Sequence, residues 1–419
     1  MGARIVLMFV ALVAVASVPI QAAQAADRTP ERIVSKRVRI LEPKRYRALR
    51  AEWQAYTEAH PRDPVGWSQL AKAAMYDGAS CREYVEYAKR AVRLGPNDAE
   101  ALATLGRVRW GTWCPEEPGD PAEAIRLLER ALELNPRLDD PHYLLWTLRM
   151  SQGRREEANE HLRALLDGGR MPEPLVDFGY NLLAGLEPNA ILLTNGDNDT
   201  YPVIALQTAR KFRTDVAVVN LSLLNLEWYR RDLRSGSGAV PVPMLEGAAD
   251  SIHAGTLSQK AVKGLLDQLK AEGNRRPLYL AVTVYDAPKV IPNRLSLEGL
   301  VYRALPAIGG EPELDAVRAK RNLDEVYRLS SVQSLSLDWD AWSAVRQLVL
   351  NYTGVALKLA SATYLSGDLS GMNARLNWIL TVMEFHHRSP GDMQGWIEYW
   401  NARDADSPEL ARWKAKYPR

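Results

Sequence analysis

The 419-residue chain has few of the residues from which common catalytic and metal sites are built. It contains two cysteines and six histidines. Only His386 and His387 are neighbours, and adjacent residues of a helix point about 100° apart rather than toward one ligand position. We find no phosphate-binding glycine loop and no Gly-x-Ser-x-Gly nucleophile turn. The sequence therefore does not predict a histidine-ligated zinc site, a P-loop or an α/β-hydrolase nucleophile.

The chain also lacks a strong net charge, with 53 basic and 51 acidic residues. This balance argues against nucleic acid or an anionic membrane as a partner held by bulk electrostatics. The apolar run at 5–20 follows Arg4 and precedes Ala23-Gln24-Ala25, which is the pattern of a cleaved signal peptide over residues 1–25. An uncleaved anchor is the alternative, but a span needs about 20 apolar residues. We expect an exported protein of the periplasm or cell envelope, with no transmembrane span after cleavage.

The two cysteines, Cys81 and Cys114, fall in turns within neighbouring helical repeats, which are described next. In an oxidising compartment such a pair is a disulfide candidate. Because the turns of adjacent repeats line one edge of an array, we expect a Cys81–Cys114 bond, with two unpaired thiols as the alternative.

Two stretches of the N-terminal half repeat a helical pattern. "AEAIRLLERALELNP" (122–136) and "REEANEHLRALLDGG" (155–169) place Ala124 and Ala158 34 residues apart. This resembles the tetratricopeptide repeat, which has that period. We expect such repeats over 63–170, after a helical lead-in over 26–62. The resemblance implies protein or peptide binding in a concave groove, and the alternative is a module that only packs against the next domain.

The pattern changes after residue 186, where apolar runs replace helical spacing. The runs 190–194, 216–221 and 277–285 read as buried strands, and "YPVIALQTARKF" between the first two reads as a helix. Strand, helix and strand at this spacing form a βαβ unit. Residues 171–310 are therefore predicted to be an α/β domain with a small parallel or mixed sheet covered by helices.

Polar residues follow each predicted strand, at the sheet edge where open α/β sheets bind ligands. Asp197 and Asp199 form an acid-x-acid pair whose oxygens suit Mg²⁺, Mn²⁺ or Ca²⁺. The alternative is a capping and hydrogen-bond network at the start of the helix near Tyr201. The ligand-binding candidates are Asn195, Asp197, Asn198, Asp199, Thr200, Asn220, Asn225 and Asp286.

The same region resembles a known family. "AILLTNGDNDTYP", "RTDVAVVNLSLLNLEWY" and "RPLYLAVTV" are similar to the soluble C-terminal region of bacterial membrane proteins of unknown function related to protein O-mannosyltransferases. The resemblance covers about residues 186–306 and implies a domain outside the cytoplasm, linked to sugar transfer onto proteins. The chain departs from it by lacking multiple membrane spans and by having Val203-Ile204-Ala205 in place of an aromatic continuation. The matching positions are Asn195, Gly196, Asp197, Asn198, Asp199, Thr200, Asn220, Trp228 and Tyr229.

Residues 311–419 have helical spacing, which predicts a C-terminal helical region. The expected fold is mostly α with an α/β domain. No catalytic set is complete, so we expect a non-catalytic protein-binding or assembly factor. Two alternatives remain open: a metal-dependent enzyme or accessory factor of envelope glycosylation using Asn195 to Thr200, and a subunit that brings peptides to a membrane glycosyltransferase.

Overall fold

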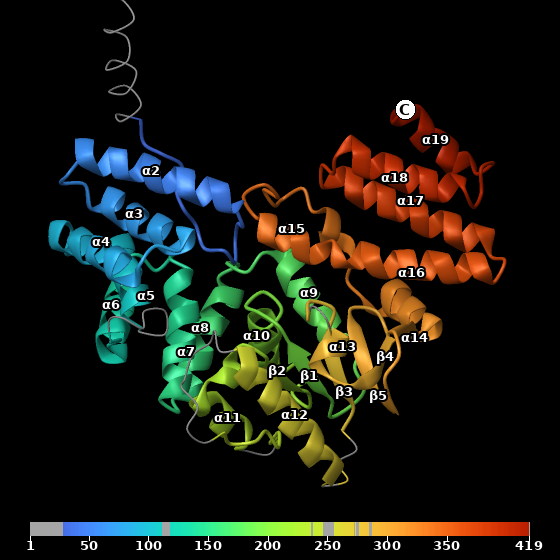
Figure 1. The fold of residues 1–419 in the computed structure, drawn as a ribbon, viewed down its shortest axis with the longest axis horizontal. Coiled ribbons are helices and arrows are strands. Elements are labelled where there is room, and N and C mark those ends of the chain that lie inside the picture. Colours follow the sequence, from blue (N-terminus) through green and yellow to red (C-terminus); the bar gives the residue numbers. More distant parts are fainter. Residues whose placement is uncertain are drawn as a thin grey trace, which may run out of the picture. The chain divides into compact units, whose positions relative to one another are not determined.

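A computed structural model describes residues 28–110, 118–235, 238–245, 255–271, 273, 276–284 and 287–418. The expected signal peptide and Cys114 lie outside these residues. The described residues divide into two compact units (Figure 1), one from the ranges 28–35 and 40–148 and the other from 36–39 and 149–418. Within the described residues, no helix has the length and apolar character needed to cross a membrane.

The first unit is helical, as its sequence pattern predicts. Its helices come in consecutive pairs, and several begin at an aspartate whose carboxylate accepts a backbone N–H of the first turn. Asp98, for example, accepts from the Ala101 N–H at 2.7 Å. The helices are α2 (Pro43–Ala59), α3 (Pro64–Asp77), α4 (Cys81–Leu94), α5 (Ala99–Arg109), α6 (Pro121–Leu134) and α7 (Asp140–Ser151).

Small residues let these helices approach closely. Ala88, Ala91 and Ala124 are fully buried. A Cβ atom added to Gly106 of α5 would lie 2.8 Å from Leu128 of α6, closer than van der Waals contact allows. The repeat pattern of small and large residues therefore corresponds to real helix crossings, as in tetratricopeptide arrays.

The second unit contains a six-stranded mixed sheet in the order β2-β1-β3-β5-β4-β6. The predicted βαβ unit is present as β1 (Ile191–Thr194), α10 (Tyr201–Arg210) and β2 (Ala217–Asn220). Strand β1 runs parallel to both β2 and β3 (Leu278–Ala281). The neighbouring helical elements are α8 (Arg155–Asp167), α9 (Glu173–Ala184), the 3₁₀ turn η1 (Leu223–Asn225), α11 (Glu227–Leu233) and α12 (Gly255–Ala271).

The other half of the sheet is not apparent from the sequence pattern. The helical spacing expected from residue 311 is wrong at its start, because β6 (Glu313–Leu314) pairs with β4 before Asp315 caps a short helix. β4 and β5 form an antiparallel pair. The elements are α13 (Ala287–Val290), β4 (Asn293–Leu297), β5 (Val301–Ile308), β6, α14 (Ala316–Arg321), the π-helical η2 (Asn322–Val326) and the 3₁₀ turn η3 (Ser330–Gln333).

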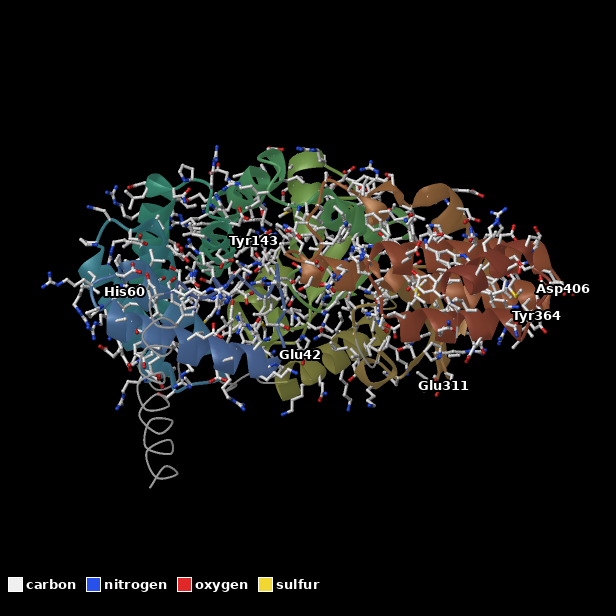
Figure 2. The ribbon with its side chains drawn as sticks, turned by 90° about the horizontal axis from the view of Figure 1, so that it is seen from above. Glu42, His60, Tyr143, Glu311, Tyr364 and Asp406 are labelled. Atoms are coloured by element: carbon white, nitrogen blue, oxygen red, sulfur yellow. The ribbon has the colours of Figure 1, made fainter. Side chains whose placement is uncertain are left out.

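The C-terminal part is helical, as expected. Figure 2 labels Tyr364 near the end of α16 and Asp406 in the turn before α19. The helices are α15 (Ser343–Val349), α16 (Asn351–Leu365), α17 (Leu369–Phe385), α18 (Pro390–Asn401) and α19 (Pro408–Lys416).

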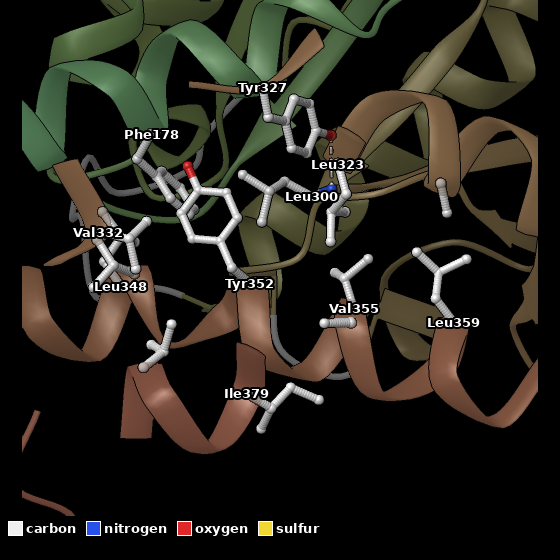
Figure 3. Close-up of a cluster of buried hydrophobic side chains, with 14 of the residues drawn as sticks. Phe178, Leu300, Leu323, Tyr327, Val332, Leu348, Tyr352, Val355, Leu359 and Ile379 are labelled. Atoms are coloured by element: carbon white, nitrogen blue, oxygen red, sulfur yellow. Dashed lines mark hydrogen bonds between the residues drawn. The ribbon is translucent and has the colours of Figure 1, made fainter. Parts of the chain in front are cut away.

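One large core joins these helices to the sheet within the second unit. Phe178 of α9 meets Tyr352 of α16 edge to face, with ring centroids 5.8 Å apart (Figure 3). The Tyr327 hydroxyl accepts the Leu300 N–H at 2.9 Å. The strands β1 and β3 are buried at every position, so both faces of the sheet centre are covered.

Candidate functional site

The carboxyl ends of the parallel strands bring polar residues together at one edge of the sheet. Thr194 of β1 stands in register with Asn220 of β2, and Thr283 follows the end of β3. The Thr200 hydroxyl lies 2.7 Å from the Thr194 hydroxyl and accepts the Asn220 side-chain N–H at 2.8 Å. Thr200 and Asn220 were candidates from the sequence, whereas Thr194 and Thr283 were not, because neither threonine stands in a distinctive motif.

Asp199 is the centre of this network. Its carboxylate accepts the backbone N–H groups of Asn195 and Gly196, both at 2.8 Å, and the hydroxyl of Thr283. The residue is only 2% exposed, and this burial raises the pKa of its carboxyl group, against the opposing effect of the accepted hydrogen bonds. The Asp199 carboxylate thus holds the loop after β1 closed and links it to Thr283, two residues beyond the end of β3.

Thr200 occupies the N-cap position of α10, but its side chain makes no capping hydrogen bond. Instead it joins the interstrand network. The alternative expected from the sequence was a capping and hydrogen-bond network; the hydrogen bonds are present, but the Thr200 side chain does not cap α10.

Asp197 lies in the same loop but has a different environment. Its side chain is 47% exposed, and it pairs with Arg37 at 3.0 Å. The Asn198 side chain donates to the Arg37 carbonyl at 2.9 Å, and the Ala344 N–H donates to the Val38 carbonyl at 3.1 Å. Residues 36–39 therefore belong to the second unit through these contacts. No sequence pattern indicated Arg37, which is 160 positions from its partner.

The remaining candidates are more local. Asn225 is buried and donates to the Ser222 carbonyl at 2.9 Å. Asp286 lies outside the described residues. Among the residues described, no group of three or more His, Cys, Asp or Glu side chains is arranged to hold a metal. The carboxylates of Asp197 and Asp199 face different protein partners, and a divalent cation on this pair stays a prediction.

The expected disulfide also stays a prediction. Cys81 is buried at the first position of α4. Its expected partner, Cys114, falls in the segment after α5 that is not described.

The first unit presents a second candidate surface, on the first helices of its pairs. The Lys72 ammonium of α3 contacts Glu100 of α5 at 2.7 Å, and Arg107 of α5 contacts Asp140 of α7 at 3.2 Å. We call the surface made by Gln69, Lys72, Tyr76, Glu100, Arg107 and Asp140 the first-helix surface. Its row of charged and amide groups crosses three helices, which suits recognition of a polar peptide backbone.

The first-helix surface holds part of the chain itself. The Ile33 N–H donates to the Gln69 side-chain oxygen at 2.7 Å, and Arg32 pairs with Glu100. The Trp53 indole of α2 donates to the Glu31 carbonyl at 3.1 Å. The helical lead-in expected over 26–62 is wrong at its start, because residues 29–35 form no helix.

Comparison with known families agrees with the helical pairs. Residues 117–174 match the family model described as a tetratricopeptide repeat. Residues 175–256 match the model described as TMEM260-associated domain 2. The tetratricopeptide match is thus confined to α6, α7 and α8 of the described residues, and the second match spans β1, α10 and β2.

Solved structures resemble the chain only distantly. One, titled "Crystal structure of MamA protein", is 19% identical over 41% of this chain and 79% of its own, with a TM-score of 0.27. A second MamA structure is 18% identical over 42% and 96%, also with a TM-score of 0.27. The structure of Naa15/Naa10 bound to HypK-THB is 13% identical over 89% and 58%, with a TM-score of 0.20. No curated protein matches this chain. At these scores the likeness carries no inference about function.

Proposed function

We propose that this protein is an exported protein-binding or assembly factor of the cell envelope, and that it binds its partner through the first-helix surface. The observation that carries the proposal is the row of partly exposed polar groups from Lys72 and Glu100 to Arg107 and Asp140, which lie on the first helices of successive pairs. Tetratricopeptide arrays bind proteins through such surfaces.

The proposed location has separate support, from the sequence alone. The apolar run after Arg4 and the small residues before Ala26 form a secretory signal. The electrostatics of the chain are also consistent with a protein partner, since 53 basic and 51 acidic residues give no bulk attraction for a polyanion.

Site-specific photo-cross-linking in living cells tests the binding surface. Ala103 lies between Glu100 and Arg107 on one face of α5, at i+3 and i−4 spacing, and is half-buried. A photoreactive residue at Ala103 should give a discrete cross-linked protein. The same residue at exposed Arg126 of α6 is the matched control and should give none. Equal products from both positions, or none from Ala103, would remove the support for this surface.

The location is tested independently. Residues 1–60 are fused to alkaline phosphatase, whose disulfides form only in an oxidising compartment. We expect enzyme activity from the native fusion and none from a Leu12→Arg fusion, which interrupts the apolar run. Equal activity in the two fusions would contradict export through this signal.

A further inference from the structure

The segment before α2 occupies the first-helix surface in an extended form. Burial alternates along it: Ile33 is 2% exposed and Ser35 is 8% exposed, while Arg32 and Val34 face outward. Alternation with period two is the pattern of an extended chain lying on a surface.

Two buried side chains bind the backbone of this segment. The Trp53 indole donates to the carbonyl of Glu31, and the Gln69 side-chain oxygen accepts the N–H of Ile33. Both side chains are 0% exposed. Without the segment, each of these polar groups would lose its backbone partner, and buried groups of this kind are rarely left unpaired.

Side-chain contacts add sequence preference to this backbone binding. The Arg45 guanidinium holds the Glu31 carboxylate at 2.8 Å. Arg32 pairs with Glu100. Ile33 enters an apolar cluster that includes Leu49 of α2 and Leu70 and Ala73 of α3. Each residue of the acidic, basic and aliphatic sequence 31–33 therefore has a complementary partner on the helices: a cation, an anion and an apolar cluster.

Glu100 is prepared for this role by its own neighbours. Its carboxylate also accepts hydrogen bonds from the Lys72 ammonium and from the side-chain N–H of Gln69. Gln69, which binds the Ile33 backbone, is thus hydrogen-bonded to Glu100, which binds the Arg32 side chain. The Gln69–Glu100 hydrogen bond therefore links recognition of the Ile33 backbone to recognition of the Arg32 side chain.

We propose that residues 31–33 are an intramolecular ligand of the repeat surface, and that a partner protein presents an extended segment of the same chemistry, acidic then basic then aliphatic, which competes with it. This inference rests on the proposed function, because it assigns the chemistry of the partner to the same surface. A short tether gives an internal ligand an effective concentration on the order of 1 mM. Free peptide therefore meets a largely occupied site until the segment is released.

The test uses the described chain from residue 28 to its last residue and a fluorescent peptide of residues 28–36, "RTPERIVSK". The Arg32→Glu/Ile33→Asp chain should release its own segment. We expect it to bind the peptide at least tenfold more tightly than the wild-type chain. A peptide carrying the same two substitutions is the control and should bind neither chain.

A charge exchange separates recognition from a general change in packing. Arg45 is about one-third exposed at its side chain and also pairs with Glu52 at 2.6 Å, so Arg45→Glu changes two ion pairs and no residue of the apolar cluster. In the released chain, a peptide with Glu31→Arg should bind weakly, and adding Arg45→Glu to the chain should restore its binding. A failure to restore binding would overturn the assigned contact with Glu31.

A measurement on the unaltered chain covers the case in which the released variant does not fold. Saturating native peptide should accelerate hydrogen exchange at the Ile33 amide, because the internal segment is displaced. Unchanged exchange, or peptide binding no tighter in a folded released chain, would overturn the proposal. If Ala103 cross-links persist in that case, the proposed protein-binding function stands and only the internal ligand is wrong.

Discussion

The two aspartates of the loop after β1 offer a matched pair for a stability prediction. They are two positions apart, yet Asp199 is buried and Asp197 is nearly half-exposed. Replacing each by asparagine keeps the shape and removes the charge. We expect a large effect at Asp199 and a small one at Asp197, because only Asp199 receives buried donors on both oxygens.

The magnitude follows from the donors that surround Asp199. Asparagine keeps one oxygen, which can still accept the Gly196 N–H, but its amide nitrogen then faces the Asn195 N–H. The Thr283 hydroxyl can rotate and accept, so one buried N–H is left unpaired at a cost of about 1–3 kcal/mol. Burial disfavours the charged carboxylate and raises the pKa of Asp199. The neutral asparagine does not carry this desolvation cost, which offsets part of the loss. We expect a net loss of about 1–2 kcal/mol.

The Asp197→Asn change removes only a partly exposed ion pair with Arg37. Such pairs contribute about 0–1 kcal/mol, and the amide oxygen can still accept from the guanidinium. A 1 kcal/mol loss shifts the Tm of a domain of this size by roughly 2–4 °C. The Asp199→Asn Tm should therefore fall by roughly 2–8 °C, with a smaller change for Asp197→Asn.

Hydrogen exchange at the Asn195 and Gly196 amides is the sharper assay, because unfolding of a two-unit chain need not be two-state. Asp199→Asn should accelerate exchange at these amides, and Asp197→Asn should leave it near the wild-type rate. Equal effects of the two changes would refute the bracing role of Asp199. If Mn²⁺ raised the wild-type Tm and either substitution abolished the rise, the loop would be a cation site instead.

Three further predictions concern other parts of the second unit. The Arg213 hydrogen bonds lower the pKa of Asp215 to about 2. The ionised Asp215 should therefore stabilise the fold above about pH 4, and this contribution should be lost as the pH falls through about 2. The Tm deficit of Asp215→Asn relative to wild type should vanish over that pH range. Burial lowers the pKa of His386 to about 4, so stability should fall as pH drops from about 6.5 to 4, and His386→Gln should flatten that slope in pH-dependent melts. Gly299 has φ +117°, and an added Cβ would lie 2.3 Å from the Tyr327 hydroxyl; Gly299→Ala should cost about 1–3 kcal/mol in a thermal melt, whereas an unchanged Tm would show that the turn can rearrange.

Sequence patterns predicted those parts of the fold in which neighbouring residues carry the information. The spacing of Ala124 and Leu128 marks a helix crossing, because both face the same helix side and both are buried. The run 190–194 indicated a strand through its uninterrupted apolar residues. By contrast, β6 was missed because Glu313–Leu314 is a two-residue strand whose pairing depends on β4, and the surrounding residues favour helix.

The same division applies to the candidate surfaces. The sequence placed Asp199, Thr200 and Asn220 at one sheet edge because parallel strands end together, a rule that needs only the strand assignments. It could not separate the roles of Asp197 and Asp199, because their environments are set by Arg37 and Thr283, which are far from the loop in the chain. Contacts between residues this far apart in the sequence depend on the tertiary fold and not on the local sequence. The acid-x-acid pattern therefore defined a polar loop, whereas its chemistry depends on one buried carboxylate that braces the sheet and one exposed carboxylate that holds a basic turn.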